Sequence, residues 1–325
     1  MDPDEHPREE LQIGGQAVIE GVVMRSRERW ALAVRRPSGD ISITINPVLT
    51  LAQKYPHLNV FPLRGVLALA DSLIIGVKAL SISAAISLEE TAEPGEDAVE
   101  PAEPVESEPE KPGISTVQIT IALVISLGLF LGLFIVLPAF LAKPFINVSG
   151  GTIVYNLIEG GIRVAIFILY LVAMALMPDV RRVFQYHGAE HKVVHAYEAG
   201  KELTVQNASE FSTAHMRCGT AFILIVLVLS VLVFSLLGRP ALWLRIVERL
   251  AIIPFVAAFS YEIIKFAGKH EKSRLTRALM APGLLLQGLT TREPDDTQLE
   301  VAIEALEAAV TPPQGQGVSA GGASA

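Results

Sequence analysis

A stretch of 29 residues without a charged side chain, Ile114–Ala142, is the feature that most restricts how this chain can fold. A helix needs about 20 predominantly apolar residues to cross the hydrocarbon core of a bilayer. Over the whole chain, 51% of the residues are hydrophobic and the mean hydropathy is +0.45. These values exclude an ordinary soluble enzyme and a disordered protein, and they predict that Ile114–Ala142 is a transmembrane helix.

Three further apolar segments are predicted to cross the bilayer. They are Leu157–Met177, Gly219–Gly238 and Trp243–Phe266. Glu159 and Arg163 stand four residues apart near the start of the first of these, so their side chains can neutralise each other on one helix face. The sequence therefore predicts an α-helical polytopic membrane protein with about four transmembrane helices.

Basic residues are unevenly distributed among the segments that connect these helices. Residues 178–218, between the second and third predicted helices, contain five lysines and arginines, and the segment after the fourth helix contains five more. Between the first and second helices, only Lys143 precedes Arg163. The positive-inside rule then places residues 178–218 and both termini in the cytoplasm, in a bacterial inner membrane. Three arginines near the second external loop disagree with this topology: Arg239, Arg245 and Arg249.

The net charge of −8 combines two parts of opposite sign. Residues 1–10, 89–113 and 293–325 together carry −19, so the rest of the chain carries +11. A basic body around apolar helices is typical of a protein that faces anionic lipid, so the bilayer is the expected partner and nucleic acid is not. Cys218 is the single cysteine of the chain, which excludes an intrachain disulfide.

The N-terminal part of the chain is predicted to be a small β-rich cytoplasmic module, residues 11–62. Its expected strands are residues 17–24, 30–36 and 40–46, and three short strands form a core so thin that the module should dock on another element. The module is also the expected surface for any protein partner. Residues 63–88 are predicted to form an amphipathic or re-entrant helix on the cytoplasmic side.

The remaining segments complete the predicted domain organisation. Residues 114–292 form the membrane domain, and residues 293–310 form a C-terminal amphipathic helix because apolar residues recur at helical spacing. Three segments are poor in residues that a core could bury and are predicted to be disordered: residues 1–10, 89–113 and 311–325.

Three histidines lie within nine residues of the predicted cytoplasmic segment, at positions 187, 191 and 195. On a helix, His187 and His191 lie one turn apart on one face, and His195 follows one turn later. Imidazoles at this spacing can bind one metal ion, and Glu190 beside them can act as general base toward metal-bound water. The spacing H-x-x-E-H is also that of inverted zinc-peptidase helices.

A second pair of possible ligands, His215 and Cys218, ends the same segment. If the second and third transmembrane helices form an antiparallel hairpin, this pair meets the first cluster at the membrane surface. Zinc suits a mixture of imidazole and thiolate ligands, so we expect a divalent metal ion, Zn²⁺, with ligands drawn from both clusters. Two alternatives remain open: solvated histidines without metal, and a structural site closed by four protein ligands.

Several long motifs resemble those of the YqhQ-like bacterial membrane proteins, also called domain of unknown function 1385. The matching segments are Gly14–Ser26, Tyr186–Glu198, Arg217–Thr220 and Pro282–Ile303. Met216 departs from the family pattern, which more often has proline there. This family is described as predicted metal-dependent enzymes, so the resemblance implies a multi-span membrane protein with a metal site and supplies no substrate. It also implies substrate-binding roles for four motif residues: Glu20, Arg25, Arg64 and Arg292.

These patterns lead to a functional hypothesis with alternatives. We expect a metal-dependent, hydrolytic enzyme at the cytoplasmic membrane face, in which His187 and His191 bind the metal. His215 or Cys218 would complete the site and Glu190 would be the catalytic base. The alternative is a non-enzymatic membrane adaptor or assembly factor with structural histidines. A transporter is disfavoured because few ionisable residues fall in the middle of the predicted spans.

Overall fold

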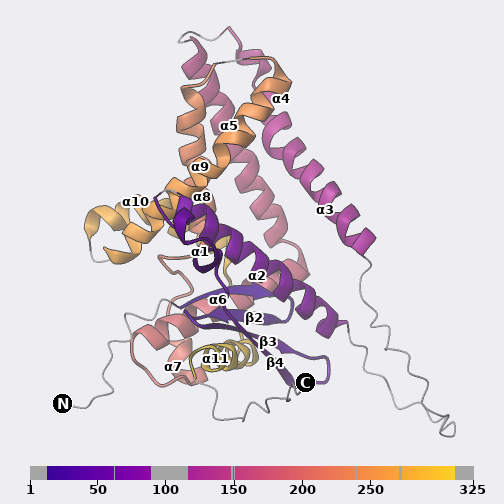
Figure 1. The fold of residues 1–325 in the computed structure, drawn as a ribbon, viewed down its shortest axis with the longest axis vertical. Helices are drawn as coiled ribbons and strands as arrows, with labels where there is room; N and C mark the ends of the chain where they lie inside the picture. Colours follow the sequence, from indigo (N-terminus) through magenta and orange to yellow (C-terminus); the bar gives the residue numbers. More distant parts are fainter. Residues whose placement is uncertain are drawn as a thin grey trace, which may run out of the picture.

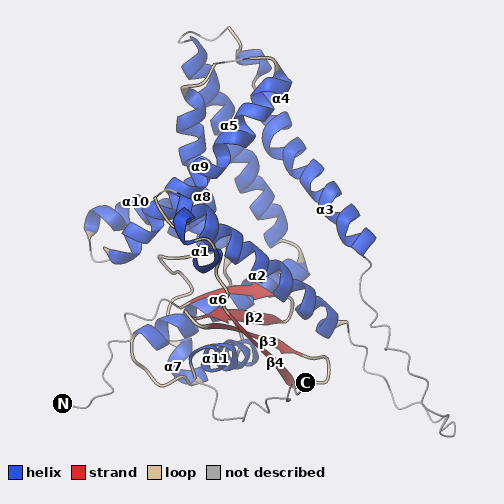
Figure 2. Cartoon of the chain, in the orientation of Figure 1, coloured by secondary structure: helices blue, strands red, loops and turns tan. Residues whose placement is uncertain are grey.

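The computed structural model describes residues 13–61, 63–88, 116–147, 149, 151–238, 240–270 and 273–311. It consists of a bundle of helices above a small helix-covered sheet (Figures 1 and 2). The predicted disordered segments 1–10 and 89–113 lie outside the described residues, as does all but the first residue of 311–325.

The sheet has four strands in the order β1 (Gly14–Val18), β2 (Gly21–Arg25), β3 (Arg29–Arg35) and β4 (Ile41–Pro47), each antiparallel to the next. The prediction of one strand over residues 17–24 was wrong, because the chain reverses there in a two-residue hairpin. Val18 pairs with Gly21, and Glu20 at the turn has φ of 52°. Tight hairpins usually place Gly, Asn or Asp at such left-handed positions, and the glutamate hid this one from sequence reasoning.

Both faces of the sheet are covered, which explains why residues 22–24 of β2 and 30–34 of β3 are all apolar. One face, including Val22 and Met24, packs on α6 (Pro178–Glu198) and α11 (Asp296–Val310). The other face, including Trp30 and Leu32, packs on α2 (Leu63–Ser87). The thin module thus does dock, and its covering helices come from three separate parts of the sequence.

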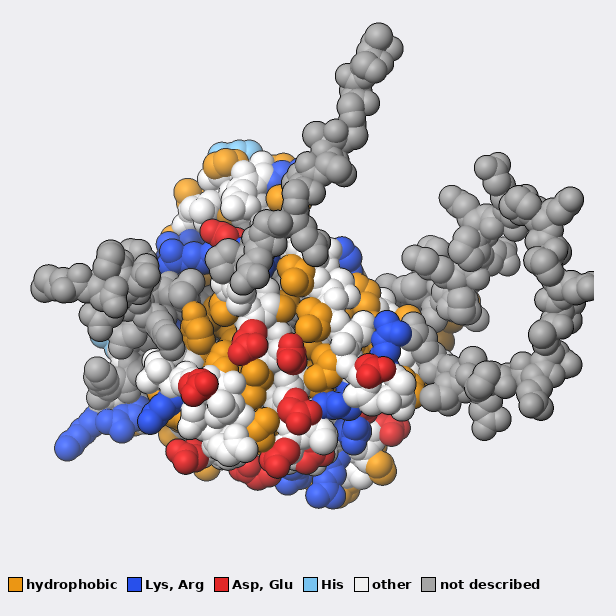
Figure 3. All heavy atoms as spheres, turned by 90° about the horizontal axis from the view of Figure 1, so that it is seen from below, with side chains coloured by type: hydrophobic (Ala, Val, Ile, Leu, Met, Phe, Trp, Pro, Cys, Tyr) orange, Lys and Arg blue, Asp and Glu red, His pale blue; other side chains and the backbone are white. Residues whose placement is uncertain are grey.

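Helix α11 confirms the amphipathic helix that the sequence predicts after residue 293. A capping box between Asp295 and Gln298 fixes its start. One side of the helix fills the core under the sheet, with Leu299 and Leu306 fully buried. The opposite side exposes Glu300, Glu304 and Glu307 to solvent. Viewed from below, acidic side chains are prominent on this end of the molecule (Figure 3).

The bundle is built from α3 (Thr116–Leu131), α5 (Gly151–Ala175), α8 (Gly219–Ser235) and α9 (Leu242–Lys269). A π-helical turn, η3 (Gly132–Val136), joins α3 to α4 (Leu137–Leu141). The described chain also contains four short helices, α1 (Leu51–Lys54), η2 (Pro56–Leu58), η4 (Lys143–Phe145) and α7 (Val205–Ser209), and the 17-residue α10 (Arg274–Thr290).

Four helical segments of the described chain are long and apolar enough to cross a membrane: Leu63–Ser87, Val124–Leu141, Gly151–Ala175 and Trp243–Lys269. The last three correspond to predicted spans. The predicted span Gly219–Gly238 forms the 17-residue apolar helix α8, at the short end of the length that crosses a bilayer.

Helix α2 joins this set by length and composition, yet it lies across the lower end of the bundle, between the bundle and the sheet (Figure 1). Its residues Ala79 and Ile86 pack on the sheet, whereas Leu73, Ile74 and Val77 are exposed. Apolar residues on both sides suit a helix with one face on protein and the other toward lipid.

Candidate metal centre

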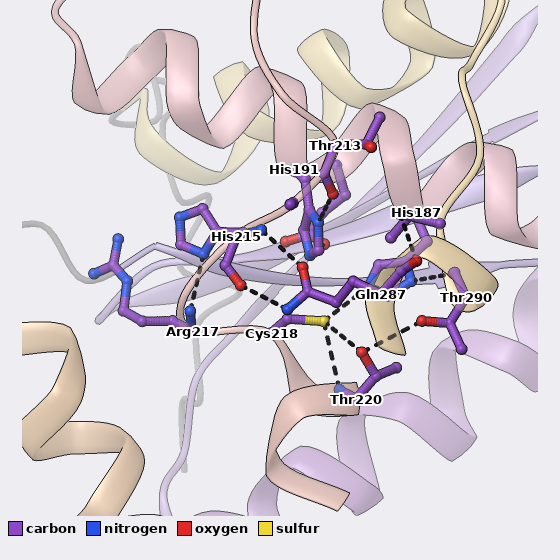
Figure 4. Close-up of polar contacts among 12 residues, drawn as sticks. His187, His191, Thr213, His215, Arg217, Cys218, Thr220, Gln287 and Thr290 are labelled. Atoms are coloured by element: carbon purple, nitrogen blue, oxygen red, sulfur yellow. Dashed lines mark hydrogen bonds and ion pairs between the residues drawn. The ribbon is translucent and has the colours of Figure 1, made fainter. Parts of the chain in front are cut away.

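Two helices bring three of the predicted ligands together. His187 and His191 lie one turn apart on α6, and Cys218 is the residue that caps the N-terminus of α8. One nitrogen of each imidazole and the sulfur of Cys218 all lie within 4.8 Å of one another, and Cys218 Sγ is 3.3 Å from His187 Nε2 (Figure 4). Imidazole and thiolate are the ligands that Zn²⁺ prefers, so the three atoms suit one metal ion.

Backbone carbonyls orient both imidazoles for this role. His187 Nδ1 lies 2.8 Å from the carbonyl oxygen of Thr290, and His191 Nδ1 lies 2.5 Å from that of Thr213. A carbonyl can only accept a hydrogen bond, so each Nδ1 carries the proton. Each Nε2 then has its lone pair available toward Cys218. Metal-binding histidines are typically held in place by this kind of outer hydrogen bond.

The environment of Cys218 favours its thiolate form. The residue is buried, and its sulfur accepts from the Thr220 amide at 3.4 Å and lies 3.1 Å from the Thr220 hydroxyl. Burial raises the pKa of Cys218, but in the metal-free chain the hydrogen bond and charge of a protonated His191, with help from Thr220, outweigh it, so the pKa is lowered overall. The thiolate is the form of cysteine that binds metals.

Glu190 lies beside the three ligands and is almost fully buried. Its Oε2 is 3.6 Å from His191 Nε2. Gly15 of strand β1 covers the carboxylate from the other side, since a Cβ at that glycine would lie 2.6 Å from Glu190 Cγ. The first glycine-containing motif of the sequence therefore serves to let Glu190 lie against the sheet backbone.

The structure divides the five predicted ligands into two groups. His195 and His215 lie with Glu198 in a second cluster next to the first. His195 Nε2 is 2.9 Å from the Ala214 carbonyl, and burial lowers the pKa of His195 to about 4, so its imidazole is neutral at pH 7.

Both nitrogens of His215 are already engaged. Its Nδ1 accepts from the Arg217 amide at 3.2 Å, and its Nε2 faces Glu198 at 3.5 Å. Glu198 also forms an ion pair with the Arg217 guanidinium. This second cluster therefore resembles a hydrogen-bonded support for the loop that carries Cys218, and sequence reasoning overlooked Glu198 as its acidic member.

Helix α10 contributes residues that sequence reasoning did not select. The fully buried Gln287 accepts from the His215 amide and donates to the His215 carbonyl, each at 2.8 Å (Figure 4). This pair of bonds fixes the loop that precedes Cys218, as a neighbouring strand would. Thr290 supplies the carbonyl for His187. Both residues lie in the Pro282–Ile303 motif, which was the one signal that could have found them.

The four predicted substrate-binding residues lie around the site and not in the ligand group. Glu20 forms an ion pair with Arg182 and accepts from the Tyr186 hydroxyl at 3.3 Å. Arg64 binds Glu262 on α9 through two hydrogen bonds of 2.5 Å. These two residues therefore join the sheet and α2 to neighbouring helices.

The other two candidates have different surroundings. Arg25 lines a small cavity of about 120 Å³ between β1 and α2, together with Gly14 and Gly15. Arg292 touches α6 through its backbone: its amide donates to the Phe184 carbonyl, and its own oxygen occupies the space that a Cβ at Gly188 would need. The Nε of Arg292 is buried without a hydrogen-bond partner.

The described fold thus defines a mostly helical protein with four candidate membrane-spanning helices and a small antiparallel sheet near its N-terminus. A family model described as "Protein of unknown function (DUF1385)" matches residues 61–312, and the chain belongs to this family. It is 34% identical over 303 residues to "Uncharacterized protein YqhQ" of Bacillus subtilis (strain 168), covering 90% of each chain. The comparison with solved structures found no match.

Proposed function

We propose that this chain is a metal-dependent hydrolytic enzyme at the cytoplasmic face of the bacterial inner membrane. The observation that supports it is a set of three convergent ligands, His187, His191 and Cys218, next to the buried carboxylate of Glu190. Catalytic zinc sites in proteins commonly have three protein ligands and one open position, whereas structural sites have four. A bound Zn²⁺ would supply a water molecule of lowered pKa for attack on the substrate.

The surroundings of the ligands favour the catalytic arrangement over the closed one. His215 is engaged at both nitrogens, and His195 groups with Glu198 and His215 instead of with His187, His191 and Cys218, so neither is poised as a fourth ligand. Glu190 is close enough to the site to take a proton from a water molecule bound there. It is held by β1 on one side and by its own helix on the other.

The distribution of charge supports the proposed orientation. The end of the molecule remote from the bundle exposes the acidic stripe of α11, which suits an aqueous environment (Figure 3). Helix α2 lies at the level where the bundle meets the sheet (Figure 1), and its Ser72 and Ile75 line a cavity with Gly15, the glycine that packs on Glu190. Both termini would then be cytoplasmic, and a substrate at the inner lipid surface would lie beside the site.

Metal analysis of the detergent-purified full chain tests the proposal. We expect about one zinc ion per chain, lost in the double variant His187→Ala/His191→Ala and retained in His57→Ala, which changes an exposed histidine. A metal-free wild-type protein that is fully folded would refute the metal site.

A second candidate function rests on the same ligands. The loop 213–218 is tied to α6 and α10 by several buried hydrogen bonds, which is also what a structural site in a membrane adaptor would need. The variant Glu190→Gln separates the two. A catalytic site requires loss of function in cells with metal retained, whereas a structural site predicts normal function.

A further inference from the structure

The helical bundle contains a cluster of charged side chains that the metal centre does not use. Glu159 and Arg163 on α5 meet Arg245 and Arg249 from α9, and the side chains of Glu159, Arg163 and Arg249 are each at most 6% exposed. The cluster lies about 24 Å along α5 from the end of that helix that leads to α6. It therefore forms a separate feature in the half of the bundle remote from the sheet.

One glutamate holds all three arginines. Glu159 Oε1 accepts from Arg163 at 2.8 Å and from Arg249, and Glu159 Oε2 lies 3.4 Å from Arg245. The ring of Phe234 lies beneath the guanidinium groups of Arg163 and Arg249, at 5.8 and 5.3 Å. The i,i+4 pair expected from the sequence is thus present, but it does not neutralise the cluster, which keeps a net charge of +2.

Hydrogen-bond donors also exceed acceptors. Arg163 Nε donates to the Phe134 carbonyl in the π-helical turn η3, and Arg245 reaches the Pro240 carbonyl at 3.4 Å. With the bonds to Glu159, this makes five bonds to acceptors in the described chain, fewer than three guanidinium groups can donate. Arg245 Nε is buried without a partner. Excess positive charge in an apolar bundle is costly unless a counter-ion compensates it.

Arg245 is the open end of the cluster. Its side chain is 14% exposed, more than those of the other two arginines, and its two hydrogen bonds are the longest of the set. Asn156, one turn before Glu159, donates to two carbonyls of α8 and its following turn, while its buried Oδ1 has no partner. An incoming ligand would therefore meet unused donors from Arg245 and one unused acceptor from Asn156.

We propose that this cluster binds a phosphate monoester group through Arg163, Arg245 and Arg249. The planar forks of arginine match the oxygens of phosphate, and a monoester carries a charge of about −1.5 to −2 at pH 7, which balances the net charge of the cluster. The acceptor Oδ1 of Asn156 would accept a hydrogen bond from the hydroxyl of the singly protonated form. The phosphate could belong to a lipid headgroup or to a soluble anion, because both present the same chemistry.

Binding to the detergent-purified full chain tests this site, with the midpoint of thermal unfolding as the readout. The probes are phosphatidic acid and inorganic phosphate, and phosphatidylcholine is the zwitterionic control. We expect saturable stabilisation by a phosphate probe and none by phosphatidylcholine. A response to phosphatidic acid alone assigns the site to lipid, and a response to inorganic phosphate assigns it to a soluble anion. No saturable response to either probe would overturn the proposal.

Variants locate the binding. Arg245→Gln should weaken the apparent affinity at least about tenfold, whereas Arg274→Gln, an exposed arginine at the start of α10, should leave it unchanged. Equal weakening in both variants would indicate general surface attraction and overturn the site. If Arg245→Gln does not fold, Arg245→Lys serves instead, since it keeps the positive charge and removes the planar guanidinium group. Wild-type affinity in Arg245→Lys would overturn the proposal that the guanidinium group recognises the phosphate. Zinc content is measured in parallel and should not change, which separates this site from the metal centre.

Discussion

The close contact between Gly15 and Glu190 leads to a prediction in which adjacent glycines differ sharply. In Gly15→Ala, the new methyl group would lie 2.6 Å from Glu190 Cγ, 2.8 Å from its Oε1 and 2.8 Å from the Val23 carbonyl oxygen. In Gly14→Ala, the methyl group would meet no atom within 4 Å. Glu190 or strand β1 must therefore shift in the first variant, whereas nothing needs to move in the second.

The expected magnitude follows from the kind of contact. Inserting a methyl group into a filled space costs about 1–3 kcal/mol, and one of the two neighbours here is backbone, which cannot rotate away. We expect Gly15→Ala to lower the free energy of unfolding by about 2 kcal/mol and Gly14→Ala to change it by less than about 0.5 kcal/mol. Urea unfolding in detergent, followed by the fluorescence of the buried Trp30, measures both.

A double-mutant cycle tests the cause. Removing the side chain in Glu190→Ala leaves the Val23 carbonyl as the remaining close neighbour, so Gly15→Ala should cost about 1 kcal/mol less in that background. Zinc content should stay unchanged in Gly15→Ala, because the three ligands come from α6 and α8. Equal stabilities for the two glycine variants, or a coupling energy of zero, would refute the contact as described.

Three further predictions concern the metal centre and its support. Cys218→Ser should lower zinc affinity by more than the about 10–100-fold typical of outer-shell changes, measured by competition with a chelator; an unchanged affinity would remove Cys218 from the ligand set. Gln287→Leu should destabilise the chain by about 2–4 kcal/mol in urea unfolding, since it leaves the buried amide and carbonyl of His215 without partners. A loss below about 0.5 kcal/mol would show that these two hydrogen bonds are not needed. Burial holds the pKa of His195 near 4 in the folded chain, so the unfolded state binds more protons between about pH 6.5 and 4. The free energy of unfolding should therefore decrease as the pH is lowered across this window, and decrease less in His195→Gln. Parallel stability curves for the two proteins would exclude His195 as the cause.

The features that sequence reasoning found are those with a local signature. The absence of charge marks the apolar helices, and the spacing of His187 and His191 indicates one helix face because a helical turn has a fixed length. No local pattern indicated that Cys218, and not His215, lies with His187 and His191. That arrangement depends on hydrogen bonds from Arg217 and Gln287, and Gln287 is separated from His215 by 72 residues.

The β-hairpin shows a different reason for failure. The turn at Glu20 is stabilised by an ion pair with Arg182, a tertiary contact across 162 residues that overrides the usual preference for glycine. Helix α2 has the composition of a membrane span, but one of its faces packs on the sheet. Composition alone does not distinguish an apolar partner made of protein from one made of lipid.

The position of the proposed metal centre has a consequence for how the two halves of the molecule are joined. Helix α6 belongs to the core under the sheet, and α8 belongs to the bundle, so ligands from both place one metal ion across the boundary between them. At the same boundary, the backbone of Arg292 packs directly against Gly188 of α6. This contact needs glycine at position 188, because a Cβ there would lie 2.0 Å from the Arg292 carbonyl oxygen. A shift of the bundle relative to the sheet would therefore alter the distance from Cys218 to His187 directly. Under the proposed function, the geometry of the site is set by the contact between the two halves and not by either half alone.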